Sequence, residues 1–234
     1  MGNAHSEPIE DTLSDGTPVV FVTESDKNVP PVDYSLWKGE AYTSAQLANG
    51  FKPDEIFPGI GMMFPGKKDF GFYAFDPRNP TKRLAEREAV PLLKYLRHVE
   101  YWCGKDIDQV SARYPACANL AALHRKVCEV VRYLYSEEEM EKILYYAGLA
   151  LDETMRGTDL SMVIQHFSLK RTKESTFTKI IVATTGHGSA KVYETIKESG
   201  SYKVELIMNL PYHIKVPISE KYGAPRFRVY EITL

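Results

Sequence analysis

The sequence predicts an α+β fold, in which a helical middle of about four helices packs on a C-terminal, mostly antiparallel or mixed sheet of about five strands that carries one helix. Three observations support this class. A strand, a glycine turn, a helix and a second strand are legible between Lys179 and Leu210. Amphipathic helical patterns fill the middle of the chain, and short strand-like runs follow from Leu160 onward. An extended, aromatic-rich N-terminal region precedes both parts.

The length of 234 residues suits one large domain or two small ones. We expect residues 1–50 to form an extended arm with a short strand, and residues 51–234 to form a single α+β domain. Within that domain, residues 51–80 are expected to form a hairpin, residues 81–156 the helices, and residues 157–234 the sheet with its helix.

Composition excludes several classes of protein. The formal net charge of −2 gives no strong signal for nucleic-acid binding. The three cysteines, an odd number without paired spacing, indicate a reducing compartment rather than a disulfide scaffold. No run of about 18 apolar residues is present, so no membrane span is expected. These features predict an intracellular, cytoplasmic protein.

The first six residues, MGNAHS, match the pattern M-G-x-x-x-[ST] for N-myristoylation. The pattern predicts a lipoprotein with myristate on Gly2, and an unmodified, disordered start stays open as the alternative. One such chain supports only marginal, reversible membrane binding, and no polybasic cluster follows it. A membrane contact through this acyl chain would place the protein at the cytoplasmic face of a membrane or within a virion.

The first part of the chain contains strand signals and an aromatic-rich stretch. Gly16–Val22 predicts a strand after a turn, and Val29–Tyr34 is expected to be an extended proline linker. Ile60–Phe64 and Phe70–Phe75, joined by a short loop with Pro and Gly, predict a hairpin. The aromatic side chains of this stretch are typical of a core or a subunit interface.

The middle of the chain predicts a run of helices. Thr81–Trp102 carries apolar residues on one side and is expected to be largely helical, with a break or a fresh start at Pro91. Asp106–Arg113 is expected to form a short helix. Leu120–Leu134 has apolar residues three and four positions apart, which is the clearest amphipathic pattern in the chain.

A capping box begins the last predicted helix of this region. Ser136 is followed three residues later by Glu139, the spacing at which each side chain satisfies a backbone N–H group of the other residue. An apolar stripe from Met140 to Leu151 predicts that the helix continues through this segment. Its short join to the preceding helix predicts an antiparallel or steeply crossed pair.

The last third of the chain predicts strands. Met162–Leu169 alternates and can pair with Phe177–Thr184 across a basic loop. His213–Ile218 and Phe227–Ile232 supply two further strands.

A glycine-rich turn follows the strand Ile180–Val182 and precedes a helix that Ser189 can cap and Gly200 can end. In a parallel crossover this turn would lie at the carboxyl end of the strand, where N–H groups and the helix dipole attract anions. An ordinary structural turn explains the same glycines, and the third glycine of G-x-G-x-x-G is missing. The candidate anion-binding residues are Gly186, His187, Gly188, Ser189 and Lys191.

Two further groups of residues resemble known sites, and neither assigns a catalytic or metal-binding residue. The units His166-Phe167-Ser168 and His187-Gly188-Ser189 resemble the catalytic H-x-[ST] repeats of the 2H phosphodiesterase families, where one His acts as base and the other as acid. In those families the repeats lie further apart and in symmetric lobes. The close C-x-x-C spacing of a zinc site is absent among the candidate ligands, which are Cys103, Cys117, His124 and Cys128.

The sequence therefore predicts a non-enzymatic structural or interaction protein of the viral matrix, capsid-associated or membrane-scaffold type. Such a protein would assemble through aromatic surfaces with copies of itself or with other structural proteins, and it would need no cofactor. The alternative is a small phosphate- or nucleotide-binding enzyme. It would use the loop from Gly186 to Lys191, with His166 and His187 as an acid/base pair.

Overall fold

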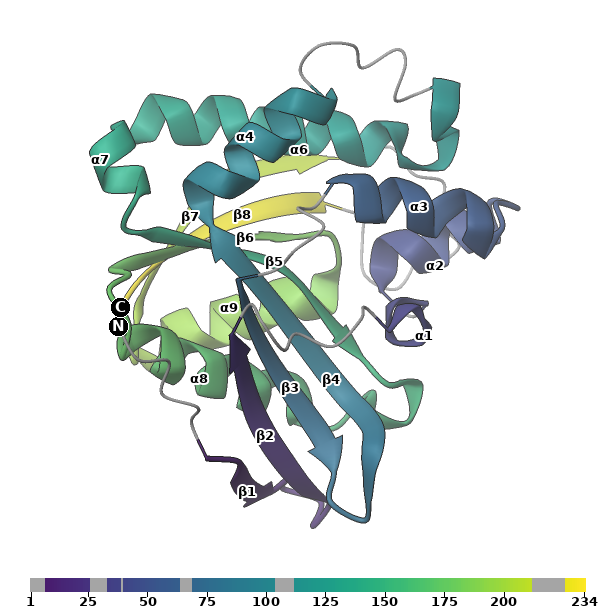
Figure 1. Cartoon of the computed structure of the whole chain (residues 1–234), viewed down its shortest axis with the longest axis vertical. Coiled ribbons are helices and arrows are strands. Elements are labelled where there is room, and N and C mark those ends of the chain that lie inside the picture. The colour runs from purple at the N-terminus through teal and green to yellow at the C-terminus, as the bar shows by residue number, and fades with distance from the viewer. Residues whose placement is uncertain (1–6, 26–32, 39, 64–68, 104–111, 212–225) are drawn as a thin grey trace.

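The structure is a computed structural model of the whole chain. It describes residues 7–25, 33–38, 40–63, 69–103, 112–211 and 226–234 (Figure 1).

Within these residues one mixed sheet runs through the molecule, with eight strands in the order β1-β2-β3-β4-β5-β6-β8-β7 (Figure 1). Every neighbouring pair is antiparallel except β5 and β6, which are parallel. The strands are β1 Ile9–Thr12, β2 Pro18–Ser25, β3 Phe70–Asp76, β4 Asn79–Pro91, β5 Ile143–Leu151, β6 Lys179–Thr184, β7 Lys203–Pro211 and β8 Arg226–Thr233.

Helices cover both faces of this sheet, and each face has its own apolar core. One core lies under α2, α3, α4 and α6, and the other under α8 and α9, which Figure 1 shows on the opposite side of the strands. The helices are α1 Tyr34–Trp37, α2 Ala41–Ala48, α3 Pro53–Met63, α4 Leu92–Cys103, α6 Ala118–Leu134, α7 Glu137–Met140, α8 Leu160–Lys173 and α9 His187–Ser199.

The central strands are apolar on both faces because helices cover both sides of them. On β5, Tyr145 belongs to the core under α4 and α6, and its neighbour Tyr146 belongs to the core under α8 and α9. On β6, Ile181 and Val182 divide in the same way. This alternation fixes the register of the parallel pair, since a slip of one residue would exchange the two faces.

Several sequence predictions are confirmed. The amphipathic segment Leu120–Leu134 lies within α6, and the capping box of Ser136 and Glu139 is formed at the start of α7. Gly200 ends α9 in the left-handed conformation, with φ 68°. The strands expected at Gly16–Val22, Ile180–Val182 and Phe227–Ile232 are present as β2, β6 and β8, and the second strand expected before Leu210 is present as β7.

The predicted fold class is wrong, because the described chain forms an eight-stranded mixed sheet rather than a helical middle over a five-stranded sheet. The first half of Thr81–Trp102 is strand β4, and a helix begins only after Pro91. This segment is rich in Arg, Leu, Ala and Glu, which favour helices in isolation. Pairing with β3 on one edge and β5 on the other overrides that preference.

Strand β5 was predicted as the continuation of the capped helix. Helix α7 spans only Glu137–Met140, and Ile143–Leu151 pairs between β4 and β6. The run ILYYAGLAL is apolar at almost every position, so it fits a helical spacing and a buried strand equally well.

Two further elements have the opposite type to the one predicted. Met162–Leu169, predicted as a strand, lies in α8, whose buried Leu160, Ile164 and Phe167 follow helical spacing. Ile60–Phe64, predicted as a hairpin arm, overlaps the end of α3. Strand β3 pairs with β2 and β4 instead of with that segment.

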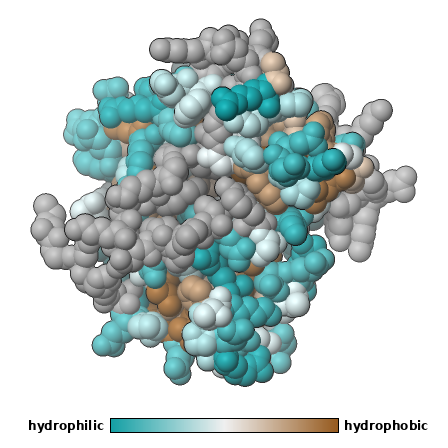
Figure 2. All heavy atoms as spheres, turned by 45° about the vertical axis from the view of Figure 1, so that its right-hand side comes forward, coloured by the Kyte–Doolittle hydropathy of each residue, from teal (hydrophilic) through white to brown (hydrophobic). Residues whose placement is uncertain are grey.

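Four predictions fall largely or wholly outside the described residues. They are the acylation at Gly2, the linker Val29–Tyr34, the helix Asp106–Arg113 and the strand His213–Ile218. Among the described residues, no helix is both long and apolar enough to cross a membrane. On the face drawn in Figure 2, the coloured apolar side chains show in separate areas rather than in one continuous band.

Candidate active site

The parallel strands β5 and β6 separate toward their carboxyl ends. They pair from Ile143 opposite Lys179 as far as Tyr146 opposite Val182. Beyond that point β5 continues to Leu151 by pairing with β4, and β6 continues to Thr184 by pairing with β8. Ligands in open α/β sheets bind outside the carboxyl ends of the strands where neighbouring connections diverge, so the gap between β5 and β6 is the candidate site.

A β-bulge marks the point at which β5 leaves β6. On β4, Glu88 lies opposite Gly148 and Ala89 lies opposite Tyr146, so Ala147 is the extra residue on β5. A bulge bends its strand and increases the local twist, and bulges occur often beside active sites. The bulge therefore accounts for the divergence of the two strands.

The side chain of Trp37 packs directly on β5 just beyond the bulge. A Cβ atom added to Gly148 would lie 2.1 Å from Cη2 of the Trp37 ring, so only glycine fits at this position. The indole nitrogen of Trp37 donates a hydrogen bond to Oε1 of Glu86 on β4, at 2.5 Å. Helix α1 is thereby held against the sheet at one side of the gap.

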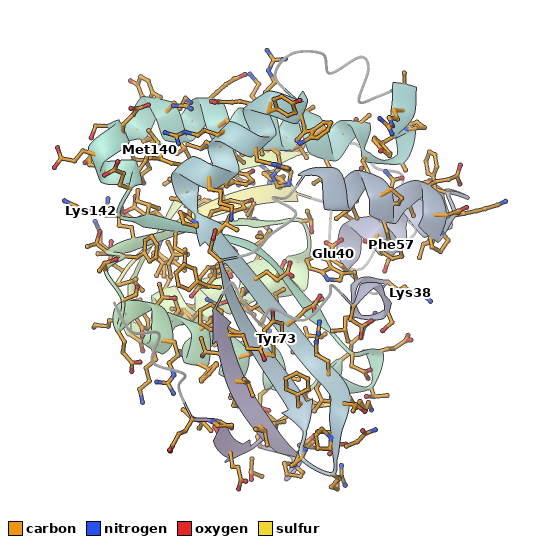
Figure 3. The ribbon with its side chains drawn as sticks, in the orientation of Figure 1. Lys38, Glu40, Phe57, Tyr73, Met140 and Lys142 are labelled. Atoms are coloured by element: carbon orange, nitrogen blue, oxygen red, sulfur yellow. The ribbon has the colours of Figure 1, made fainter. Side chains whose placement is uncertain are left out.

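Glu40 reaches the other side of the gap. It precedes the first turn of α2, where Oε2 accepts a hydrogen bond from the backbone N–H of Thr43 at 3.0 Å. Its other carboxylate oxygen accepts a hydrogen bond from the hydroxyl of Thr185, the first residue after β6. Figure 3 shows Glu40 where the chain enters α2. Trp37 thus packs on β5, and Glu40 is bonded to the residue that follows β6.

The part of β4 beneath Trp37 carries buried acidic side chains. Glu86 is fully buried and forms an ion pair with Arg83, and Glu88 follows it on the same face of β4. Burial, together with the nearby Glu88 carboxylate, raises the pKa of Glu86, although its bonds to Trp37 and Arg83 oppose this. A buried carboxylate with two donors fixes the orientation of the Trp37 ring.

The residues of the sequence-predicted anion loop lie at the start of α9, directly after Thr185. The prediction that Ser189 caps the helix is wrong, because the capping position is Gly186 and Ser189 lies within the first turn, where its hydroxyl donates to the Gly186 carbonyl at 3.0 Å. The side chains of His187 and Lys191 are exposed, as is Gly188. Anion binding by this loop stays a prediction from the sequence.

The other candidate constellations lie elsewhere. His166 is on the exposed side of α8, whereas Ser168 is buried and donates to the carbonyl of Gln165 at 2.9 Å. His124 is buried in α6 beside Tyr95 of α4, and burial lowers its pKa to about 4. Cys117 is buried against α3, where its thiol donates to the carbonyl of Ile56 at 3.3 Å. Among the described residues, no group of three or more His, Cys, Asp or Glu side chains is arranged to hold a metal ion.

Sequence reasoning missed the residues that define the gap. Thr185 and Glu40 are 145 positions apart, and no spacing rule connects them. The only local signal was Glu40 three residues before Thr43, which lets a carboxylate accept a bond from the first turn of a helix.

No protein-family model matches the sequence, and no curated protein matches it. The fold does match solved structures. Arylalkylamine N-acetyltransferase 2 from Aedes aegypti superposes with a TM-score of 0.58 over 91% of this chain and 98% of that chain, at 10% sequence identity. This is the N-acetyltransferase fold. A protein named as arylalkylamine N-acetyltransferase 7, from the yellow fever mosquito, superposes with a TM-score of 0.53 over 99% of this chain and 98% of that chain, also at 10% identity.

The likeness overturns the functional prediction made from the sequence. The chain has the fold of proteins named as enzymes, so the prediction of a non-enzymatic, myristoylated virion or scaffold protein is wrong. The alternative of a phosphate- or nucleotide-binding enzyme with His166 and His187 as its acid/base pair is wrong as well, since the matching proteins are named as acetyltransferases. The physical reason is that the site depends on contacts between distant segments, which a search for local motifs does not detect.

Proposed function

We propose that the protein is an N-acyltransferase of the GCN5-related type, which transfers an acetyl group from acetyl-CoA to the nitrogen of an amine. The observation that carries the proposal is the divergence of the parallel strands β5 and β6. Trp37 packs on β5 beside this gap, and Glu40 is bonded to the residue that follows β6. The N-acetyltransferase fold supports the same conclusion.

The edge of β5 fits the pantetheine arm of acetyl-CoA. From Ala147 to Leu151 this strand is no longer paired with β6. An extended ligand with amide groups can add to such an edge as another strand would, through main-chain hydrogen bonds. When bound, acetyl-CoA would supply an activated thioester: an unprotonated amine forms the new C–N bond at its carbonyl carbon, the C–S bond breaks, and coenzyme A leaves as a thiolate that takes up a proton.

Glu40 is the candidate general base. A primary aliphatic amine is protonated at neutral pH, because ammonium groups of the lysine type have a pKa of about 10.4. Before it can react, the nitrogen must lose a proton to a group within hydrogen-bond reach, directly or through one water. Glu40 is partly buried beside the end of β6, and its two donors, Thr43 on α2 and Thr185 after β6, fix the carboxylate.

Thr185 is the candidate orienting residue for that base. Its hydroxyl donates to Oε1 of Glu40 from the first position after β6. The same hydroxyl can pass a proton onward, since a hydroxyl is both donor and acceptor.

Glu40→Gln tests the proposal. The purified protein is incubated with acetyl-CoA and a panel of primary amines, and N-acetylated products are detected by mass spectrometry. We expect product with the wild type and a rate lower by about 10²- to 10⁴-fold in the variant, the usual contribution of a general base. Acetyl-CoA binding should not change, because glutamine keeps the oxygen that caps α2.

Glu138→Gln is the matched control. Glu138 lies on α7 with its side chain 86% exposed, so its loss of charge should leave the rate unchanged. Equal rates for the wild type and Glu40→Gln would contradict the role of Glu40. Absence of any acetylated product from the wild type, with acetyl-CoA at saturation, would contradict the proposed function.

A further inference from the structure

Arg87 is a buried cation whose hydrogen bonds to described residues are made with neutral side chains. It lies on β4 and is only 2% exposed. Its Nη2 donates to Oε1 of Gln165 on α8 at 2.6 Å and to the hydroxyl of Tyr193 on α9 at 2.9 Å. Its guanidinium carbon lies 5.1 Å from the centre of the Tyr146 ring. In the part of the chain that the structure describes, no Asp or Glu forms an ion pair with it, and every contact named here is to a neutral group.

The cluster has more donors than acceptors. Nε of Arg87 and Nε2 of Gln165 are both buried, and neither has a hydrogen-bond partner among the described residues. Oε1 of Gln165 already accepts from both Arg87 and the Tyr193 hydroxyl. An unmet N–H of a buried charged group is costly, so each such group in a native protein needs an explanation.

The position of this cluster explains why its buried donors have no partner within the described chain. Tyr146, beneath the guanidinium, is the last residue of β5 that pairs with β6. Gln165 and Tyr193 come from the two helices that cover the parallel pair on this face. The guanidinium therefore lies over the last residue of β5 that pairs with β6, on the face covered by α8 and α9, and Arg87 itself is opposite Leu149, in the part of β5 that no longer pairs with β6.

We propose that Arg87, assisted by Gln165, binds a carbonyl oxygen of the ligand that enters between β5 and β6. This inference rests on the proposed function, under which the ligand is acetyl-CoA and the oxygen belongs to an amide of its pantetheine arm. The Nε group of Arg87 and the amide nitrogen of Gln165 supply the missing donors. A neutral carbonyl suits this place better than a phosphate, because a buried phosphate would carry the larger desolvation penalty of an anion.

Titration calorimetry with two probes, coenzyme A and pantetheine, tests the assignment. The probes share the amide-bearing arm, and only coenzyme A carries phosphates. We expect Arg87→Met to weaken both probes by the same factor, about 10- to 100-fold, as for a hydrogen bond from a charged donor. Arg87→Lys keeps the positive charge but lacks the planar guanidinium with its several N–H donors. It should therefore recover only part of the affinity that Arg87→Met loses.

Arg132→Met is the control for the removal of an arginine. Arg132 is on α6, over the opposite core, and pairs with Glu100 at the surface, so both probes should bind this variant like the wild type. A loss confined to coenzyme A would overturn the assignment in favour of a phosphate contact. Unchanged binding of both probes to folded Arg87→Met would leave Arg87 a purely structural residue and also overturn it.

A wild-type measurement covers the case in which Arg87→Met does not fold. With ¹⁵N-labelled arginine, the Nε–H resonance of Arg87, assigned through Arg87→Lys, should shift when coenzyme A saturates the protein. An unshifted resonance at saturation would contradict the proposal. If the wild type binds neither probe, the proposed function fails together with this inference. If it binds both and the resonance is unshifted, the inference fails alone.

Discussion

At the scale of single residues, His124 couples the stability of the protein to pH. Its Nδ1 lies 2.5 Å from the hydroxyl oxygen of Tyr95, its ring packs edge-on against Phe227, and burial lowers its pKa from 6.5 to about 4. Between these two values the unfolded chain binds more protons than the folded one. The contribution of His124 to the free energy of unfolding is therefore fully present above about pH 6.5. It is lost as the pH falls toward 4, which lowers the free energy of unfolding by about 3 kcal/mol in all.

His124→Gln isolates this contribution. Glutamine does not titrate, so the difference in the free energy of unfolding between pH 7 and pH 5, measured with urea, should be smaller in the variant. Other groups with shifted pKa values, such as Glu86 and Glu231, are present in both proteins and cancel in the comparison. The same pH dependence in both proteins would show that His124 is not held neutral by burial.

Gly148 tests the contact on which the gap depends. Gly148→Ala places a Cβ where the Trp37 ring lies, so the ring or the strand must move. We expect a loss of stability of about 1–3 kcal/mol, typical of overpacking. Urea unfolding measures the loss, and a change in tryptophan fluorescence reports displacement of the ring.

A double-mutant cycle with Trp37→Phe assigns the cost to this pair of residues. Phenylalanine lacks the outer ring atom that the new methyl group would meet, so Gly148→Ala should cost clearly less in that background. Equal costs in the two backgrounds would mean that the strain at Gly148 comes from another neighbour.

At the scale of elements, the two ends of α9 place opposite demands on glycine. Gly200 has φ 68°, a left-handed conformation that other residues adopt only at a cost. Gly188 lies in the first turn with no positive φ, and an added Cβ would meet nothing within 4 Å. We expect Gly200→Ala to lower the free energy of unfolding by about 1–2 kcal/mol, and Gly188→Ala to raise it by about 0.5–1 kcal/mol.

The two variants serve as controls for each other in denaturant unfolding, since each adds one methyl group to the same helix. Equal effects of the same sign would contradict the described geometry of the helix ends. The outcome does not depend on any ligand.

Elements whose start, end or buried face depends only on neighbouring residues were predictable from the sequence. The periodicity of α6, the capping box of α7 and the glycine stop of α9 each depend on residues within one or two turns. Strand β4 and helix α8 carry misleading local signals, because pairing along both edges decides the first and packing over β3 and β4 decides the second. Local preference is a weak prior wherever such contacts are numerous.

At the scale of the whole molecule, the candidate site could not be read from the chain. The sequence indicated that the loop after β6 would lie at the carboxyl end of a strand, and the structure places it there, beside Glu40. It did not indicate that β5 would be the parallel neighbour, since that segment was predicted to be helical. The contacts of Trp37 with Gly148, of Glu40 with Thr185 and of Arg87 with Gln165 each join residues that are far apart in the chain.

The most direct test of the central claim is isothermal titration of the wild-type protein with acetyl-CoA. We expect saturable binding of one acetyl-CoA per chain, with a dissociation constant of about 1 mM or lower, since about 1 mM is the upper end of the usual range of KM values of enzymes. An absence of binding at concentrations of about 1 mM, by a protein that unfolds cooperatively, would contradict the claim that the gap between β5 and β6 is an acyl-CoA site.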